Sequence, residues 1–190
     1  MPDHRKTCRR FNDAGHAHSL TFSCFRRQRF LSRDRSREWL VAAVQRALEK
    51  HKYHLWAYVI MPEHVHLLVW PTVEDYKIST FLQSVKTSVS RRAVAFAKSN
   101  APWFLSRMLD RQPNGDESYR FWQRGGGHDR NITEPRTAWA EIDYYHFNPV
   151  RRNLCVRPED WSWSSAGDYA GIRHGPLTID FVSLPRNAEG

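Results

Sequence analysis

Two apolar runs of the sequence, HLWAYVIM at residues 54–61 and HVHLLVW at residues 64–70, stand on either side of the dipeptide Pro62-Glu63. Both runs are rich in β-branched and aromatic residues, which favour strands. Proline cannot donate a hydrogen bond to a sheet ladder, so Pro62 is expected at a junction and not inside a strand. The pattern therefore predicts two consecutive strands joined by a short turn, to which the rest of the fold must be fitted.

The second run carries two histidines, His64 and His66, one residue apart. Side chains two apart on a strand point to the same face of the sheet, so both imidazoles are expected on one face. Such a pair is well suited to binding a cation. A hydrogen-bonded core histidine beside a second histidine at a strand edge explains the same residues, and this run alone does not decide between the two.

Alternating and helical periodicities extend along the chain. They predict strands at residues 18–25, 54–61, 64–70 and within 124–132, helices at 36–51, 79–98 and 133–148, and a loop with a turn at 109–118. This order predicts an α+β fold, a ferredoxin-like sandwich in which an antiparallel sheet has its helices on one face. A length of 190 residues fits a single domain over residues 1–190.

Composition argues against several classes of protein. No apolar run approaches the roughly 20 residues that span a membrane, and the first residues lack the apolar segment of a signal peptide. We therefore expect a cytoplasmic protein with no membrane partner. The three cysteines, Cys8, Cys24 and Cys155, are too few and too widely spaced to predict a disulfide framework or a zinc ribbon.

The formal net charge is +9, and 23 of the 29 cations are arginine. The positive charge is concentrated in the first half of the chain, most densely in FRRQRFLSRDRSR at residues 25–37. Guanidinium groups match the geometry of phosphate oxygens. This distribution favours a polyanionic partner, nucleic acid first, over a merely well-solvated surface, although charge alone does not separate DNA, RNA and lipid.

The predicted helix at 133–148 offers further polar groups for a cation site. Tyr144 and Asn148 are four residues apart, and therefore on the same face of the helix. Asn148 stands immediately before Pro149, where the partial negative charge of a helix C-terminus favours a cation. Tyrosine and asparagine are also ordinary residues at helix ends, so this pair alone carries little weight.

Three segments, taken together and in order, resemble a known family. MPEHVHLL at residues 61–68 is similar to the His-hydrophobic-His signature of HUH endonucleases, and DYYHFNPVRRNL followed by PEDWSWSS resembles the C-terminal part of the REP-associated tyrosine transposases. FWQRGGGHDRNI resembles the segment that precedes the catalytic helix of that family. The resemblance covers about residues 17–170 and implies a ferredoxin-like core there, flexible ends and a catalytic helix in the C-terminal part.

The resemblance implies an enzyme that cleaves and rejoins single-stranded DNA at hairpins of the repetitive extragenic palindromic (REP) type. Carried over by position, the nucleophile that forms a 5′-phosphotyrosine is Tyr144, and the ligands of Mg²⁺ or Mn²⁺ are His64, His66 and Asn148. The neighbouring Tyr145 leaves open which phenol reacts. The resemblance gives His128 no role.

DNA backbone binding is expected from basic residues of the first half, namely Arg26, Arg27, Arg29, Lys86, Arg91 and Arg92. The protein is expected to be a monomer or a homodimer. Three alternatives remain: a plasmid relaxase or replication initiator, a catalytically idle regulator that binds hairpin DNA, and a small zinc protein that uses His64, His66 and a cysteine. A relaxase normally carries further domains, for which 190 residues leave no room.

Overall fold

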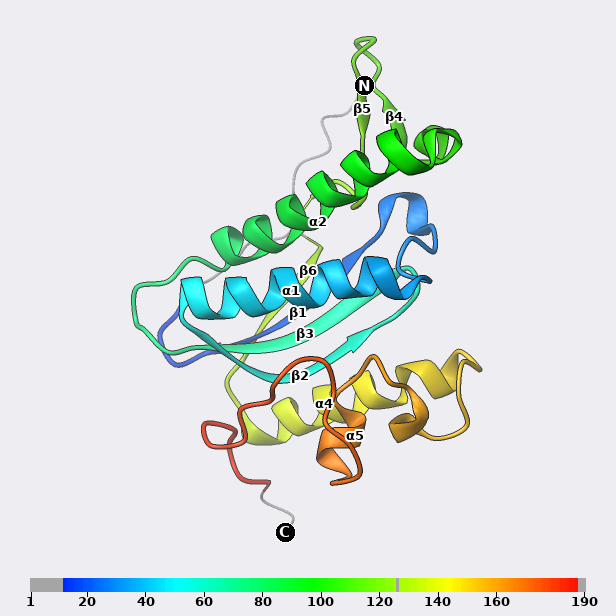
Figure 1. The fold of residues 1–190 in the computed structure, drawn as a ribbon. Helices are drawn as coiled ribbons and strands as arrows, with labels where there is room; N and C mark the ends of the chain where they lie inside the picture. Colours follow the sequence, from blue (N-terminus) through cyan, green and yellow to red (C-terminus); the bar gives the residue numbers. More distant parts are fainter. Residues whose placement is uncertain (1–11, 126, 188–190) are drawn as a thin grey trace.

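The computed structural model describes residues 12–125 and 127–187, so Cys8 and the outermost parts of the ends expected to be flexible, residues 1–11 and 188–190, lie outside the described residues. A four-stranded antiparallel sheet with the order β2-β3-β1-β6 forms the centre of the molecule (Figure 1). Its strands are β1 (Ala17–Ser23), β2 (Tyr53–Ile60), β3 (His64–Pro71) and β6 (His128–Ile132). The two apolar runs are β2 and β3, with Pro62 between them, as predicted.

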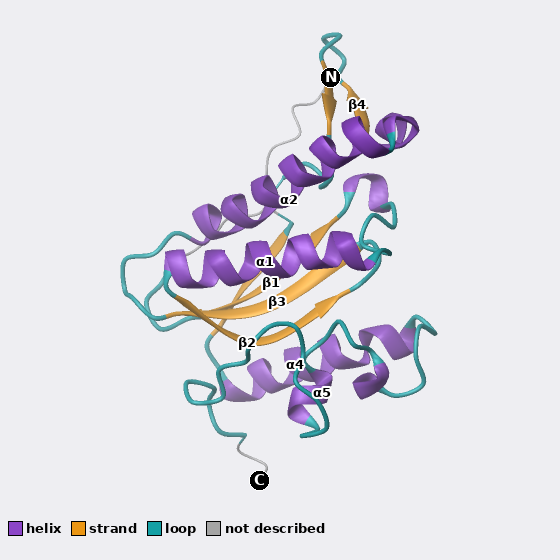
Figure 2. Ribbon diagram, viewed as in Figure 1, coloured by secondary structure: helices purple, strands orange, loops and turns teal. Residues whose placement is uncertain are grey.

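The helices lie on both faces of this sheet (Figure 2). The long helices α1 (Asp34–His51) and α2 (Ile78–Asn100) cover one face, whereas α4 (Pro135–Arg151) and the short α5 (Ala166–Tyr169) lie across the other. The α+β class with an antiparallel sheet is thus confirmed. The expectation that all helices share one face is corrected by α4.

Strand β2 supplies the physical reason for the second layer. Tyr58 and Ile60 of this strand belong to the core beneath α1 and α2, whereas Trp56 and Val59 belong to a second apolar cluster that includes Ile142 of α4. A strand that is apolar on both sides must be covered on both sides, because exposed apolar surface is unfavourable in water. The prediction of helices on one face overlooked this double pattern.

Smaller elements complete the chain. They are the 3-10 turns Phe25–Arg27, Pro102–Phe104 and Pro158–Asp160, the short helix α3 (Leu105–Met108), and the strands β4 (Leu109–Arg111) and β5 (Glu117–Tyr119). Strands β4 and β5 form a separate hairpin where a loop was expected, with the expected turn between them. Among the described residues, no helix is long and apolar enough to cross a membrane.

The segment after α4 runs along the outer edge of β2 and also contacts α4. The backbone of Ser165 donates to Tyr58 O at 3.1 Å, and Asp180 N donates to Leu55 O at 2.9 Å. The Ser165 hydroxyl also contacts His146 Nε2 of α4 at 2.8 Å. The segment therefore covers an edge strand that would otherwise be open to pairing with another chain, and it fixes the position of α4.

We expect Ser165→Ala to destabilise the protein by about 1–3 kcal/mol, because the buried ring nitrogen of His146 and the N–H of Tyr58 both lose the hydroxyl as a partner. The free energy of unfolding in urea measures this loss. The exposed Ser162 is the matched control, and Ser162→Ala should change stability by no more than about 0.5 kcal/mol. Equal stability of the two variants would contradict the proposed support of α4.

Candidate functional site

A pocket of about 450 Å³ opens between the sheet and α4. Ten residues line it: Thr21, Ser23, Arg27, Glu63, His64, His66, Tyr144, Asn148, Arg151 and Arg152. They come from β1, the 3-10 turn Phe25–Arg27, the turn before β3, β3 itself, the last turns of α4 and the C-cap that follows them. The four residues proposed from the sequence as nucleophile and metal ligands thus line a single pocket, although about 80 positions separate the histidines from the other two.

Strand alternation explains why both histidines enter this pocket. Val65 and Leu67 point into the core beneath α1 and α2. His64 and His66 alternate with them along the strand and therefore point to the face that α4 covers. The centroids of the two imidazole rings are 4.8 Å apart. The expectation that both imidazoles lie on one face is confirmed.

His66 is held by neighbours on two other elements, β1 and α4. Its Nδ1 is 2.7 Å from the hydroxyl of Thr21 on β1, and its Nε2 is 3.2 Å from Nδ2 of Asn148 on α4. Its ring stacks on that of Tyr145, with centroids 4.9 Å apart. Burial, followed by the charges of His64 and His128, lowers the pKa of His66 to about 3. The imidazole is therefore neutral at physiological pH, the form that binds a metal.

His64 is oriented by a carboxylate. Its Nδ1 donates to Glu63 Oε1 at 3.2 Å, and Arg152 Nη2 donates to the same oxygen at 2.5 Å. Burial lowers the pKa of His64, and the nearby Glu63 opposes this only in part. In the neutral ring this arrangement leaves the lone pair on Nε2, as expected for a histidine whose other nitrogen is fixed by an outer partner.

His64 and His66 can hold a divalent cation only if the side-chain amide of Asn148 contributes a third ligand. In the described residues no group of three or more His, Cys, Asp or Glu side chains could hold a metal ion, so the alternative of a zinc site with a cysteine gains no support. Asn148 faces His66 Nε2 through its Nδ2, and a half-turn of the amide places Oδ1 there instead. Two imidazoles and one amide oxygen would leave coordination positions for water and phosphate.

The two adjacent tyrosines differ in access. Tyr145 is fully buried, and its phenol oxygen lies 2.7 Å from Ser19 Oγ. Burial raises the pKa of Tyr145 well above its usual range. Tyr144 is 45% exposed and lines the pocket, with its ring centroid 5.6 Å from that of His66. Of the two phenols that the sequence left open, the accessible one is Tyr144.

Helix α4 extends further than the sequence suggests. It includes Pro149 and continues to Arg151, so Asn148 lies within the last turn and not at its end. The extension brings Arg151 beside Tyr144, with the guanidinium carbon 5.2 Å from the centroid of the phenol ring. It also brings Arg152, the C-cap, to the pocket wall.

The six basic residues expected to bind DNA do not form one surface. Arg27 lines the pocket, and Arg29 lines an adjoining pocket of about 390 Å³. Lys86 lines another, of about 220 Å³, which also includes Arg27 and His128. The guanidinium of Arg26 lies over the ring of Phe25, 4.9 Å from its centroid. Arg91 and Arg92 are exposed on α2, which lies on the opposite face of the sheet from α4.

Several lining residues were missed from the sequence. Arg151 and Arg152 follow the proposed ligand Asn148 directly, and this proximity could have indicated them. Thr21 gives no signal of its own, because its place beside His66 depends on the register of β1 against β3. Gly127 has a physical role that the run of glycines only hinted at. It has a φ of +76°, and a Cβ there would lie 2.1 Å from the backbone oxygen of Thr21.

Comparisons with protein families, with individual proteins and with solved structures each find similar proteins. Residues 14–104 match the family model described as transposase IS200 like. A REP-associated tyrosine transposase of Haemophilus influenzae is 24% identical over 124 residues, which cover 65% of this chain and 65% of that relative. A solved structure of a REP-associated tyrosine transposase bound to a REP hairpin superposes with a TM-score of 0.67 at 18% identity, over 96% of this chain and 98% of that one. At this identity the structural likeness shows the fold.

We expect Thr21→Val to weaken the binding of Mn²⁺ by about tenfold, because the isosteric change removes the partner that fixes His66 Nδ1. Isothermal titration calorimetry measures the dissociation constant. The exposed Thr178 provides a control, and Thr178→Val should leave the constant unchanged. Unaltered Mn²⁺ binding by the Thr21 variant would show that this hydroxyl does not position the ligand.

Proposed function

We propose that this chain, whose residues 14–104 match the family model described as transposase IS200 like, is a metal-dependent endonuclease and strand transferase that acts on single-stranded DNA at hairpins of the REP type. The observation that carries the proposal is the convergence of Tyr144, His64, His66 and Asn148 on one pocket. All four residues come from one chain, so the proposal holds for a monomer or a homodimer. Such a substrate would be met in the bacterial cytoplasm.

The first step is an in-line attack of the Tyr144 phenol oxygen on the scissile phosphorus. A bond forms between that oxygen and phosphorus, the bond to the 3′-oxygen breaks, and the 3′-hydroxyl leaves with a proton. A divalent cation, Mg²⁺ or Mn²⁺, held by His64, His66 and Asn148 would stabilise the charge that develops on a non-bridging oxygen. The 5′-phosphotyrosine retains the energy of the phosphodiester, so rejoining requires no ATP.

The arginines of the pocket support the same reaction. Arg27, Arg151 and Arg152 line it together with Tyr144. Guanidinium groups in a partly enclosed pocket bind phosphate oxygens strongly and hold them in a defined orientation. Arg152 is also bonded to Glu63, which orients His64, so one side chain links the phosphate-binding wall to a proposed metal ligand.

A hairpin-binding regulator without activity is the alternative. The same basic pocket would bind DNA in such a protein. The regulator has no need, however, for an accessible phenol next to two neutral imidazoles, and these groups favour the enzyme.

We expect Tyr144→Phe to reduce formation of the covalent DNA adduct by about a thousandfold or more, because the attacking oxygen is removed. Hairpin binding should stay within about twofold, since the ring remains. A labelled hairpin incubated with protein and Mn²⁺, followed by denaturing gel electrophoresis, measures the adduct.

The neighbouring tyrosine is the matched control. Tyr145→Phe should keep the adduct and lose only the hydrogen bonds of its phenol to Ser19 Oγ and Leu67 O, at a cost in stability of about 1 kcal/mol. The reverse pattern, with the adduct lost in Tyr145→Phe alone, would exclude Tyr144 as the nucleophile. An adduct absent from the wild type under all conditions would favour the idle regulator.

We further expect His66→Ala to abolish the adduct and Asn148→Ala to reduce it less, because water can replace an amide oxygen but not an anchored imidazole. Chelation with EDTA should have the same effect as His66→Ala, with recovery on addition of Mn²⁺. Undiminished adduct formation in EDTA would eliminate the metal from the mechanism.

A further inference from the structure

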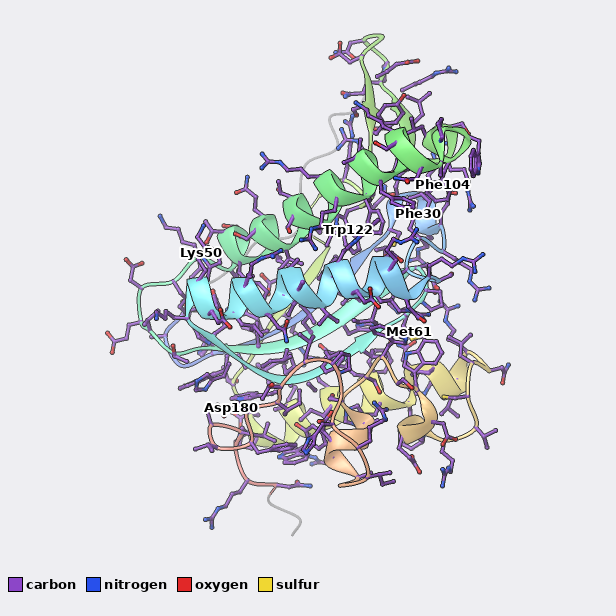
Figure 3. The ribbon with its side chains drawn as sticks, viewed as in Figure 1. Phe30, Lys50, Met61, Phe104, Trp122 and Asp180 are labelled. Atoms are coloured by element: carbon purple, nitrogen blue, oxygen red, sulfur yellow. The ribbon has the colours of Figure 1, made fainter. Side chains whose placement is uncertain are left out.

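A second groove, of about 780 Å³, lies between the N-terminal end of α1 and the C-terminal end of α2. Its walls carry the aromatic side chains Trp39, Phe96 and Phe104, all only partly buried, with the buried Phe30 behind them. The rings form two pairs: the centroids of Trp39 and Phe96 are 5.7 Å apart, and those of Phe30 and Phe104 are 5.3 Å apart. Figure 3 shows Phe30 and Phe104 close together at the end of α2. We call this feature the aromatic groove.

Four arginines, Arg29, Arg33, Arg35 and Arg107, line the same groove. Two of them lie over its rings: the guanidinium carbon of Arg35 is 4.3 Å from the centroid of Phe96, and that of Arg107 is 5.2 Å from the centroid of Phe104. Among the described residues that line the groove there is no aspartate or glutamate. The groove thus combines flat apolar surfaces with uncompensated positive charge.

The aromatic groove is connected to the candidate site. Arg29 lines both the groove and the adjoining pocket of about 390 Å³. Arg27 and Arg152 line both that adjoining pocket and the pocket that contains Tyr144. A path of adjoining pockets that share arginines therefore leads from the proposed nucleophile to the aromatic rings.

From this path we infer that the aromatic groove binds unpaired nucleotides of the DNA strand whose scissile phosphate lies at Tyr144. This inference rests on the proposed function. Aromatic and guanidinium planes stack on unpaired bases of any sequence, whereas the bases of a duplex keep their faces stacked on one another. The four arginines match the phosphates of such a strand. An apolar peptide would gain nothing from that charge.

Two variants of the groove test the inference. Arg33→Gln with Arg35→Gln removes two exposed charges, and Phe104→Leu removes a stacking plane while it keeps apolar bulk. Affinity is measured by fluorescence anisotropy on the full chain with EDTA present, for a blunt hairpin and for the same hairpin with an unpaired 5′ or 3′ extension. A denaturing gel verifies that the DNA stays intact. Circular dichroism verifies the fold of each variant.

We expect each variant to lose about tenfold in affinity for at least one extended hairpin, and less than about twofold for the blunt hairpin. The double variant Arg136→Gln with Arg186→Gln is the control, because it removes the same charge from two exposed residues that do not line the groove. Its affinity for the extended and the blunt hairpin should fall by the same small factor.

Three results would overturn the inference. Unchanged affinity for every DNA would mean that the groove serves another partner, such as a peptide. An equal loss for extended and blunt hairpins would place the duplex there. A loss for the extended hairpin in the control as large as in the groove variants would reduce the effect to net charge. Because the readout is binding, an absence of Tyr144 adduct would count against the proposed function alone.

Discussion

The stacking of His66 on Tyr145 is the contact on which the candidate site depends. It joins the central strand β3 to α4 across the face that α1 and α2 leave uncovered, and the bond from Tyr145 to Ser19 fixes the rotation of the helix. One step along a helix turns a side chain by roughly 100°. With Tyr145 directed into the sheet, Tyr144 is therefore directed to the open side, and Asn148, one turn further, reaches Nε2 of His66.

This arrangement explains why the polar groups of the site are found in a buried layer. An imidazole enclosed by Thr21, Tyr145 and Asn148 cannot easily take up a proton, and the pKa of His66 falls to about 3. The same enclosure that makes protonation costly keeps a lone pair available for a cation. The free-energy cost of burying a neutral imidazole is also small when both of its nitrogens have hydrogen-bond partners, as expected for a core residue. The two explanations that the sequence left open for His66 are therefore compatible in one structure.

The sequence indicated more of the site than of the layers around it. Strand alternation placed His64 and His66 on one face, and helical periodicity placed Tyr144 in line with Asn148. Both inferences need only local geometry. The side of the sheet on which α4 packs depends on the whole apolar surface of β2. The position of Thr21 depends on the register of β1 against β3, in which Thr21 pairs with His66, 45 positions further along the sequence. Such long-range properties cannot be predicted from any one segment of the sequence.

The run of arginines at residues 25–37 shows most clearly what a sequence leaves undecided. Arg27 lines the candidate site, Arg29 lies between that site and the aromatic groove, and Arg35 lies over a ring of the groove. Arg37 has a different environment.

The side chain of Arg37 is almost buried, and its guanidinium packs against the rings of Trp161 and Trp163 at 5.3 and 5.2 Å from their centroids. Burial lowers the pKa of Arg37, although its bond to Asp34 opposes the shift. This arginine attaches the C-terminal segment to α1, and the same segment holds α4 in place through Ser165. The arginines of this run therefore have two different roles. Some line the candidate site and its adjoining grooves, whereas Arg37 helps to fix the helix that carries Tyr144. The division follows from where each side chain meets the folded chain, since the charge of every member is the same.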